Sequence, residues 1–402
     1  MLDNLTLGID ASNIRAGGGV THLVELLRAA QPQEHGFQRV IVWGCAATLD
    51  MLEDRPWLYK RHEPLLDRSL PLRLYWQRFM LDRVVRREGC DVLFVPGGSY
   101  SGSFRPLVSM SQNLLPFEWT EARRYGFSWQ LLRNMLLRFS QSWSFRAANG
   151  VIFLTGYARN AVMTSVKGLD GRTSTIPHGI NAHFFLAARP QKTLEKASLE
   201  HPLRILYVSI IDVYKHQWHV AEAVAQLKKE GMPIYLDLVG PAYPPALMRL
   251  NRILHRFDQQ KEFIHYRGTV PYAELFKWYH QADIFVFASS CENMPIILLE
   301  AMAAGLPIAC SNRGPMPEVL GAAGIYFDPE NPVEIACAIR TLLDSPALRA
   351  EKAEAAYRRA QAFTWQRCAE QTFQFLSQQA ADSPQCKINP VVDYLWKSPS
   401  NQ

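Results

Sequence analysis

The chain has 402 residues, of which 48% are hydrophobic and 20% are charged, and its formal net charge is +6. This length suits two domains, and the composition excludes a disordered protein. No run of 18 uncharged apolar residues occurs, and the N-terminus lacks the basic and then apolar pattern of a signal peptide. We therefore expect a cytoplasmic globular protein without a transmembrane helix.

The distribution of the cysteines and of the charge indicates which kinds of site and surface the protein has. The seven cysteines are scattered, odd in number and free of C-x-x-C pairs, which argues against a disulfide framework or a zinc site. Residues 55–146 hold 15 Lys and Arg against 7 Asp and Glu, and all but one of these basic residues are Arg. Large apolar side chains alternate with the arginines. The pattern favours a surface that meets anionic lipid headgroups, although a solvated face or a nucleic-acid-binding surface looks similar.

The first half reads as a parallel α/β unit. A strand predicted over residues 5–9 leads into Gly17, Gly18 and Gly19, and a helix is predicted over residues 20–29. The glycines let a phosphate or a sugar lie against the backbone, or they form only a flexible turn. Further strands are predicted over residues 40–42, 92–95, 107–110 and 150–154. Strands that alternate with helices indicate a parallel sheet.

The second half repeats this alternation after a polar linker over residues 189–202. Strands are predicted over residues 205–208, 235–239, 263–266, 284–287, 308–309 and 325–327. Helices are predicted over residues 218–229, 245–257, 272–280 and 332–343. A last helix over residues 365–379 is expected to cross back to the first domain. The expected domains are residues 1–185 and 186–370, and residues 371–402 form the end of the crossover helix and a polar tail.

The most informative segment is VFASSCENMPIILLEAMAAGLP at residues 286–307. A strand runs into a loop with Glu292, and a helix follows with Pro295 in its first turn and Glu300 farther along. The helix N-terminus then lies at the carboxyl edge of a sheet, where phosphate-bearing ligands bind. Both carboxylates are expected to face one crevice. Otherwise Glu292 is a solvated loop residue and Glu300 a helix-surface charge.

This segment resembles the E-x7-E region of the retaining glycosyltransferases of family 4. The resemblance implies that Glu292 approaches the donor sugar and that Glu300 binds the ribose hydroxyls of the nucleotide. It implies an α/β fold of two Rossmann-like domains facing each other across a cleft (GT-B type), with the acceptor on the first and the nucleotide sugar on the second. It also places four residues between the glutamates at the donor: Asn293, Met294, Pro295 and Ile296.

A second segment resembles the G-R-x-x-x-x-K-G-like stretch of this family. Lys215 matches the lysine that clamps the diphosphate, or it is an exposed lysine at the start of a helix. Ser209 stands at the glycine and Ile210 at the arginine, so another residue or a helix dipole must carry more of the charge. Gly240 follows the next strand, at the sheet edge where the nucleotide base commonly rests.

A third segment surrounds Asn113, where many family members carry a histidine that contacts the donor sugar. An amide forms hydrogen bonds with a sugar but is no general base at neutral pH. The alternative is that Asn113 caps the following helix. His178 lies in a turn similar to the family's I-P-N-G-V segment and either lines the cleft or is structural. The candidate catalytic residues are therefore Glu292, Lys215 and Asn113.

The resemblance implies retaining transfer of a hexose from a UDP- or GDP-sugar to a glycan or lipid-linked acceptor, in cell-surface polysaccharide or lipopolysaccharide O-antigen synthesis. No D-x-D motif calls for a metal, and no cofactor is expected besides the nucleotide-sugar substrate. The Arg-rich first domain is expected to meet the anionic inner face of the plasma membrane, and no nucleic acid is expected as a partner. A nucleotide-sugar epimerase of the same fold and a non-catalytic glycan-binding or scaffold protein are the alternatives.

Overall fold

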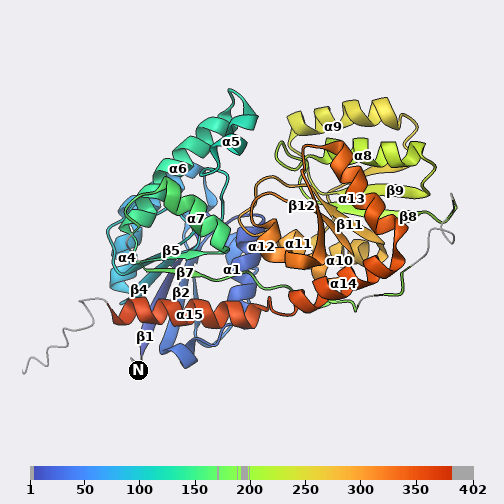
Figure 1. Ribbon diagram of the computed structural model, residues 1–402. Helices are drawn as coiled ribbons and strands as arrows, with labels where there is room; N and C mark the ends of the chain where they lie inside the picture. Colours follow the sequence, from blue (N-terminus) through green and yellow to red (C-terminus); the bar gives the residue numbers. More distant parts are fainter. Residues whose placement is uncertain (1–3, 170–171, 188, 192–197, 199, 383–402) are drawn as a thin grey trace, which may run out of the picture.

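A computed structural model describes residues 4–169, 172–187, 189–191, 198 and 200–382 (Figure 1). Two parallel β-sheets, of seven and six strands, form the centres of two lobes, and helices cover both sheets. The α/β fold with two Rossmann-like domains is confirmed. The tail at residues 383–402 and part of the predicted linker, residues 192–197 and 199, lie outside the described residues.

The N-terminal sheet has the strand order β3-β2-β1-β4-β5-β6-β7. Its strands are β1 (Leu5–Asp10), β2 (Phe37–Gly44), β3 (Leu58–His62), β4 (Val92–Val95), β5 (Leu107–Met110), β6 (Gly150–Phe153) and β7 (Arg172–Thr175). All six residues of β1 are buried, as expected for a central strand that pairs with β2 and β4. The edge strands β3 and β7 were missed because LYKRH and RTST lack an apolar run.

Helices α1 to α7 belong to this domain. They are α1 (Gly18–Ala29), α2 (Ala46–Leu49), α3 (Leu70–Phe79), α4 (Leu81–Arg87), α5 (Trp119–Ala122), α6 (Trp129–Ala147) and α7 (Gly156–Ser165). Side-chain caps fix the start of the last two, because the Ser128 and Thr155 hydroxyls accept backbone N–H groups from Leu131 and Ala158.

The C-terminal sheet has the order β10-β9-β8-β11-β12-β13. Its strands are β8 (Leu203–Val208), β9 (Ile234–Val239), β10 (Ile264–Gly268), β11 (Ile284–Phe287), β12 (Ile308–Ser311) and β13 (Gly324–Phe327). Its helices are α8 (Gln217–Lys229), α9 (Pro244–Phe257), α10 (Tyr272–Gln281), α11 (Ile296–Ala303), α12 (Met316–Leu320), α13 (Pro332–Asp344) and α14 (Pro346–Ala360). The strand order reverses between β8 and β11, and the loops that follow these two strands therefore meet at a switch point.

Helix α15 (Trp365–Ala381) returns to the N-terminal domain, as expected, and runs beneath its sheet (Figure 1). The Phe373 ring contacts Phe37 edge to face, with ring centroids 5.9 Å apart. A side chain at Gly150 would place a Cβ only 2.8 Å from Phe375, so this glycine lets the helix approach the sheet. Among the described residues, no helix is long and apolar enough to cross a bilayer.

Candidate active site

A cavity of about 760 Å³ lies between the two domains, at the carboxyl ends of both sheets. The loop after β1 contributes residues 15–18 to its wall, and the loops after β8, β9 and β11 contribute the opposite side. Nine of the thirteen predicted site residues line this cavity: Gly17, Gly18, Ser209, Gly240, Glu292, Met294, Pro295, Ile296 and Glu300. The other four are Gly19, Asn113, Lys215 and Asn293.

Glu300 lies on α11 and is only 1% exposed, so the surface-charge alternative is wrong. The Tyr279 hydroxyl donates a hydrogen bond of 2.7 Å to its Oε2. Burial raises the pKa of this carboxyl to about 8, although hydrogen bonds from Tyr279 and Tyr272 act in the opposite direction. Below that pH the carboxyl is neutral and carries a proton, so it is both a donor and an acceptor.

Glu292 and Lys215 form an ion pair, in which the ammonium of Lys215 donates to Oε1 of Glu292. The side chain of Lys215 is 4% exposed and that of Glu292 is 16% exposed, so neither is the solvated charge of the alternative interpretation. The ammonium also lies over the rings of Tyr214 and Phe287, at 5.1 and 5.2 Å from their centroids. In this arrangement Glu292 faces the cavity and neutralises Lys215 behind it.

Three glycines bring backbone to the cavity wall. Gly240 has φ +142°, and a Cβ there would lie 2.2 Å from the carbonyl oxygen of Ser209, so no other residue fits. Gly17, with φ +71°, precedes the first residue of α1. A Cβ on Gly18 would lie 4.0 Å from Cδ1 of Ile296, which shows that the two domains meet at this loop.

Besides Lys215, three predicted residues lie outside the cavity wall. Asn113 accepts the backbone N–H of Leu115 at 3.1 Å and so starts a turn rather than capping a helix, because the next helix, α5, begins at Trp119. Asn293 donates its amide N–H to the carbonyl of Ser111 at 2.8 Å and so joins the two domains. Gly19 lies in the first turn of α1.

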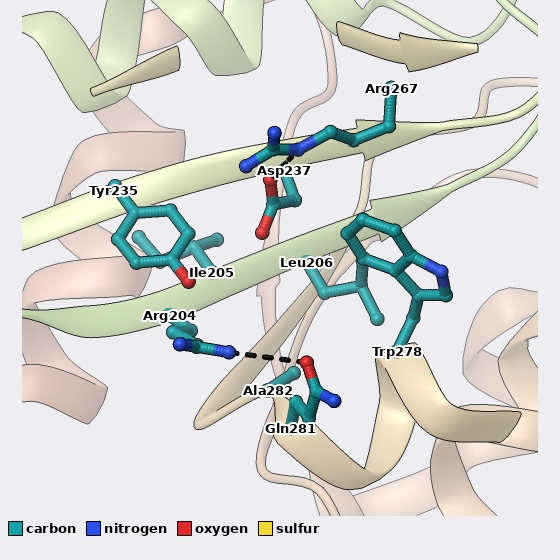
Figure 2. A pocket seen from close by; sticks show the side chains of 9 residues that line it. All are labelled: Arg204, Ile205, Leu206, Tyr235, Asp237, Arg267, Trp278, Gln281 and Ala282. Carbon is teal, nitrogen blue, oxygen red and sulfur yellow. Dashed lines mark hydrogen bonds and ion pairs between the residues drawn. The ribbon is translucent and has the colours of Figure 1, made fainter. Parts of the chain in front are cut away.

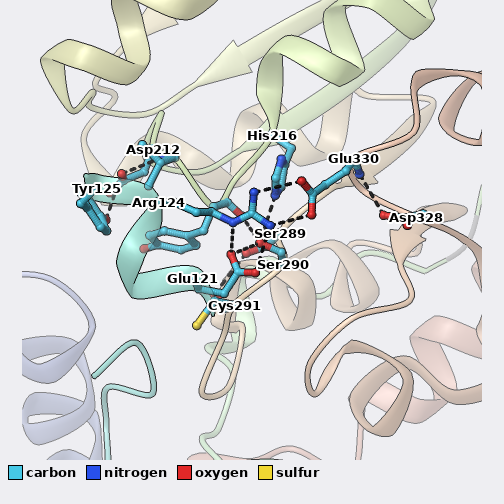
Figure 3. A network of polar contacts seen from close by, with 12 residues as sticks. Glu121, Arg124, Tyr125, Asp212, His216, Ser289, Ser290, Cys291, Asp328 and Glu330 are labelled. Atoms are coloured by element: carbon cyan, nitrogen blue, oxygen red, sulfur yellow. Dashed lines mark hydrogen bonds and ion pairs between the residues drawn. The ribbon is translucent and has the colours of Figure 1, made fainter. Parts of the chain in front are cut away.

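A polar network between the domains was missed by the sequence interpretation (Figure 3). The guanidinium of Arg124 donates to Glu121, on α5, at 2.8 Å and to Glu330, in the C-terminal domain, at 2.6 Å. Glu121 also accepts the Ser290 hydroxyl at 2.5 Å. We call these four residues the clasp. The i,i+3 spacing of Glu121 and Arg124 indicates only a helix pair, and nothing in the sequence points to Glu330, 206 positions away.

The clasp has neighbours that hold the two loops of the Lys215–Glu292 pair. The Tyr125 hydroxyl donates to Asp212 at 3.0 Å, and His216 bonds the Ser290 hydroxyl at 3.0 Å. Farther along the interface, Glu318 accepts the first two backbone N–H groups of α7, from Gly156 and Tyr157. Because the contacts of Tyr125 with Asp212 and of α7 with Glu318 cross the domain boundary, the site is assembled by closure of the two domains.

A smaller hollow of about 270 Å³ lies on the side of the C-terminal sheet, against α10 (Figure 2). Its charged groups have partners within the hollow: Arg267 donates to Asp237 at 2.6 Å and Arg204 to Gln281 at 3.2 Å. Arg204 stands near the beginning of β8, and the hollow therefore lies away from the carboxyl edge that holds the cavity. Among the described residues, no group of three or more His, Cys, Asp or Glu side chains is arranged to hold a metal ion.

Comparison with protein families covers both domains. Residues 16–184 match the family described as glycosyltransferase family 4, and residues 202–345 match the one described as glycosyl transferases group 1. The chain belongs to the family 4 glycosyltransferases. The resemblance inferred from the Glu292–Glu300 segment is therefore confirmed, and the family match extends into the N-terminal domain, where the sequence motifs were sparse.

Two relatives of this family 4 member are named for different activities. A glycogen synthase of Mycobacterium tuberculosis (strain ATCC 25618 / H37Rv) is 27% identical over 261 residues, which are 63% of this chain and 60% of that protein. An O-antigen chain mannosyltransferase B of Escherichia coli is 36% identical over 110 residues, which are 27% of this chain and 29% of that protein. The matched region thus spans less than two thirds of either relative.

Solved structures share the fold of this chain. A sucrose-phosphate synthase from Thermosynechococcus elongatus superposes with a TM-score of 0.74 over 94% of this chain and 100% of that one, at 19% identity. Anabaena HepE, solved in complex with UDP-glucose, gives a TM-score of 0.67 over 93% of this chain and 100% of that one, at 18% identity. At these identities the likeness is one of fold, and the fold is GT-B.

Proposed function

We propose that the protein is a retaining hexosyltransferase that moves a hexose from a UDP- or GDP-sugar to a hydroxyl of a glycan or lipid-linked acceptor. The pathway we propose is the synthesis of cell-surface polysaccharide or lipopolysaccharide O-antigen. One observation carries the proposal: a single interdomain cavity brings together Glu292, Glu300 and glycine-bearing loops of both domains. No cofactor or metal ion is included in the proposal.

The positions of the residues around the cavity suggest which part of the donor each of them would bind. Glu300 lies deep in the C-terminal wall and would bind the ribose hydroxyls, while Glu292 would contact the hexose. The backbone around Gly18 and Gly240 would approach the diphosphate, since neither residue has a side chain that blocks it. The N-terminal domain supplies the opposite wall, where the acceptor would enter.

The bonds that form and break in the proposed reaction determine where charge must be stabilised. The acceptor oxygen bonds to the anomeric carbon as the bond from that carbon to the diphosphate oxygen breaks. The bonding pair stays with the diphosphate, and the proton of the acceptor hydroxyl goes to the departing diphosphate. Negative charge therefore develops on the diphosphate, and fixed cations or helix N-termini aimed at it lower the barrier.

Two relatives support the choice of donor and pathway. The similar Escherichia coli protein is an O-antigen chain mannosyltransferase, which is an enzyme of surface glycan synthesis by its name. The HepE structure contains UDP-glucose, which identifies nucleotide sugars as the ligand class to test first.

The acceptor side of the proposal rests on α6, which exposes apolar side chains and buries polar ones. Its buried residues are Asn134, Gln141, Ser142, Ser144 and Phe145. Its exposed large apolar side chains are Trp129, Leu132, Met135, Leu136, Phe139 and Trp143. A helix in water shows the reverse arrangement, and the apolar side chains recur at the spacing of one helix face.

Helix α3 lies beside α6, because Ser99 bonds both Gln77 of α3 and Ser140 of α6. It also exposes large side chains: Leu70, Leu72, Leu74, Tyr75 and Phe79. Neither helix contains Asp or Glu, whereas Arg78 and Arg133 are exposed on them. We call this surface of α3 and α6 the apolar–basic face. Its chemistry fits an anionic membrane that presents a lipid-linked acceptor.

Nucleotide binding tests the donor half of the proposal. We expect UDP or GDP, alone or as a sugar conjugate, to raise the melting temperature, since a ligand at 100 times its Kd stabilises by about 2.7 kcal/mol. Glu300→Ala should weaken this effect, while Glu354→Ala, at a partly exposed glutamate of α14 that does not line the cavity, serves as the control. No shift with UDP, GDP or ADP would contradict the proposal.

Product analysis separates the alternatives. Incubation with donor alone should give no epimerised nucleotide sugar, and addition of acceptor should give a glycoside with the donor's anomeric configuration. If Glu292→Ala and Lys215→Ala both left glycan elongation in cells intact, the protein would be a scaffold rather than an enzyme.

A further inference from the structure

The positively charged side chain in the cavity wall comes from the N-terminal domain and is not the expected Lys215. Among the described residues that line it, Arg15 is the one with a basic side chain, and Glu292 and Glu300 are acidic. Lys215, the lysine expected to clamp the diphosphate, is buried behind the wall and paired with Glu292. A dianionic diphosphate placed in the cavity would therefore meet Arg15 as its cationic side chain.

Arg15 is oriented by two backbone carbonyls, and its charge also interacts with the Asp67 carboxylate, which binds His62 and the backbone N–H of Ala46. Its guanidinium donates to two backbone carbonyls, of Arg68 at 3.1 Å and of Asp67 at 3.4 Å. A carbonyl holds a guanidinium in position but carries no net charge. The residue is exposed, and its charge is available to a ligand that enters the cavity.

Two helix N-termini point to the same cavity. Helix α1 begins at Gly18 after Gly17, and α11 begins at Ile296 after Pro295. Neither start has a side-chain cap or an acidic residue in its first turn, and all four residues line the cavity. Each start presents unpaired N–H groups and partial positive charge. Arg15 precedes α1 by three residues, so its charge adds to that of the helix start.

The C-terminal domain lacks a cation at the corresponding place. Ile210 lines the cavity after β8 and is 36% exposed, and its side chain has no charge. We propose that Arg15, from the N-terminal domain, supplies the diphosphate-binding cation that Ile210 does not. This inference rests on the proposed function. It also means that the anion site is complete only when the domains are closed, because the guanidinium and the N-terminus of α11 belong to different domains.

Binding measurements on purified full-length protein test the inference. Titration calorimetry compares UDP and GDP with uridine and guanosine, for the wild type and for Arg15→Ala. We expect the variant to bind the diphosphate about 10- to 100-fold more weakly, as for loss of a charged hydrogen bond, and to bind the nucleoside unchanged. Arg159→Ala, an exposed arginine on α7 away from the cavity wall, should match the wild type.

A compensating variant makes the test specific. Ile210→Arg, introduced into Arg15→Ala, places a guanidinium on the other wall of the cavity and should recover diphosphate affinity at least tenfold. Circular dichroism and the melting temperature establish that each variant is folded.

The outcomes distinguish the two proposals. A wild type that binds none of UDP, GDP and ADP contradicts the proposed function and this inference with it. A wild type that binds a diphosphate while Arg15→Ala binds it equally well contradicts the inference alone. An equal loss for nucleoside and diphosphate also overturns it, because the role of Arg15 would then not depend on the phosphates.

Discussion

At the scale of single residues, Glu300 has the most unusual protonation. Its pKa in the folded state is about 8, against an ordinary value of 4.5, because it is buried. The folded protein therefore holds a proton that the unfolded chain releases between these two values. Its contribution to stability is fully present below pH 4.5 and is lost as the pH rises toward 8, at up to about 1.4 kcal/mol per pH unit.

Glu300→Gln should remove this pH dependence. The glutamine has a similar shape, keeps hydrogen-bonding capacity toward Tyr279, and does not titrate. We expect the variant to gain about 2 kcal/mol relative to the wild type when the pH is raised from 5.5 to 7.5. Urea unfolding at both pH values measures the gain, and Glu354→Gln on α14 is the control. A stability difference that is the same at both pH values would contradict the assigned pKa.

The glutamate pair was predictable because its signal is local. A strand, a loop with Glu292, Pro295 and a helix with Glu300 occur within 17 residues, and their order alone places both carboxylates at one sheet edge. The contact of Asn293 could not be predicted in this way, because its amide donates to the carbonyl of Ser111, which lies 182 positions away in the sequence. Arg15 shows another limit: the Gly17–Gly19 loop was recognised, but the charge beside it gained meaning only when the cavity placed it opposite Ile210.

At the scale of elements, the central strands could be predicted from the sequence, and the edge strands β3 and β7 could not. Buried strands such as β4 and β11 are continuous apolar runs, whereas β3 and β7 pair on one side only and carry polar residues. Helix α14 was also missed. A single residue, Ser345, separates it from α13, and its alanines pack against the core without a strong apolar pattern.

The clasp joins elements rather than residues, because it ties α5 and the turn after it to the loops after β11 and β13 (Figure 3). Arg124→Ala should weaken domain closure, since it removes the bonds to Glu330 and leaves the buried Glu121 without its cation. We expect a larger radius of gyration by solution scattering and faster proteolysis between the domains. The KM for the donor should rise about 5- to 10-fold, corresponding to about 1 kcal/mol for a partly exposed pair.

Two comparisons make the clasp prediction specific. Arg358→Ala breaks an exposed ion pair within α14, to Glu354, and should change none of these quantities. Glu330→Ala combined with Arg124→Ala should cost less than the sum of the single changes, because both remove the same bond. Additive effects and an unchanged radius of gyration would show that the clasp does not hold the domains closed.

At the scale of the whole molecule, the two-domain arrangement followed from the repeated strand–helix alternation, and α15 closes it. The helix carries the chain from the C-terminal domain back to the N-terminal one, where Phe373 and Phe375 pack (Figure 1). Which surfaces face each other could not be read from the sequence. The faces are set by interdomain contacts such as Thr155 to Asn293 and Gly156 to Glu318, which join distant parts of the chain.

The apolar–basic face gives the molecule a side suited to a membrane, and vesicle binding tests this property. We expect the protein to co-sediment with vesicles that contain phosphatidylglycerol and to bind pure phosphatidylcholine vesicles less, because exposed arginines contribute about 1 kcal/mol each near an anionic surface. Phe139 and Trp129 are 76% and 68% exposed. Changing both to Ser should weaken vesicle binding at least tenfold, since each large apolar side chain contributes about 1.5–3 kcal/mol when buried.

A control variant and a change in ionic strength test whether vesicle binding is due to the apolar–basic face. Met248→Ser alters an apolar side chain of α9 that is 56% exposed, and it should leave vesicle binding unchanged. Raising the salt concentration should weaken the electrostatic part of binding by screening, while the apolar part persists. If the wild type ignored anionic vesicles and glycosylated only soluble sugars, the face would have another role. A lipid-linked acceptor would then be excluded, because the apolar–basic face, on which that part of the proposal rests, would not meet a bilayer.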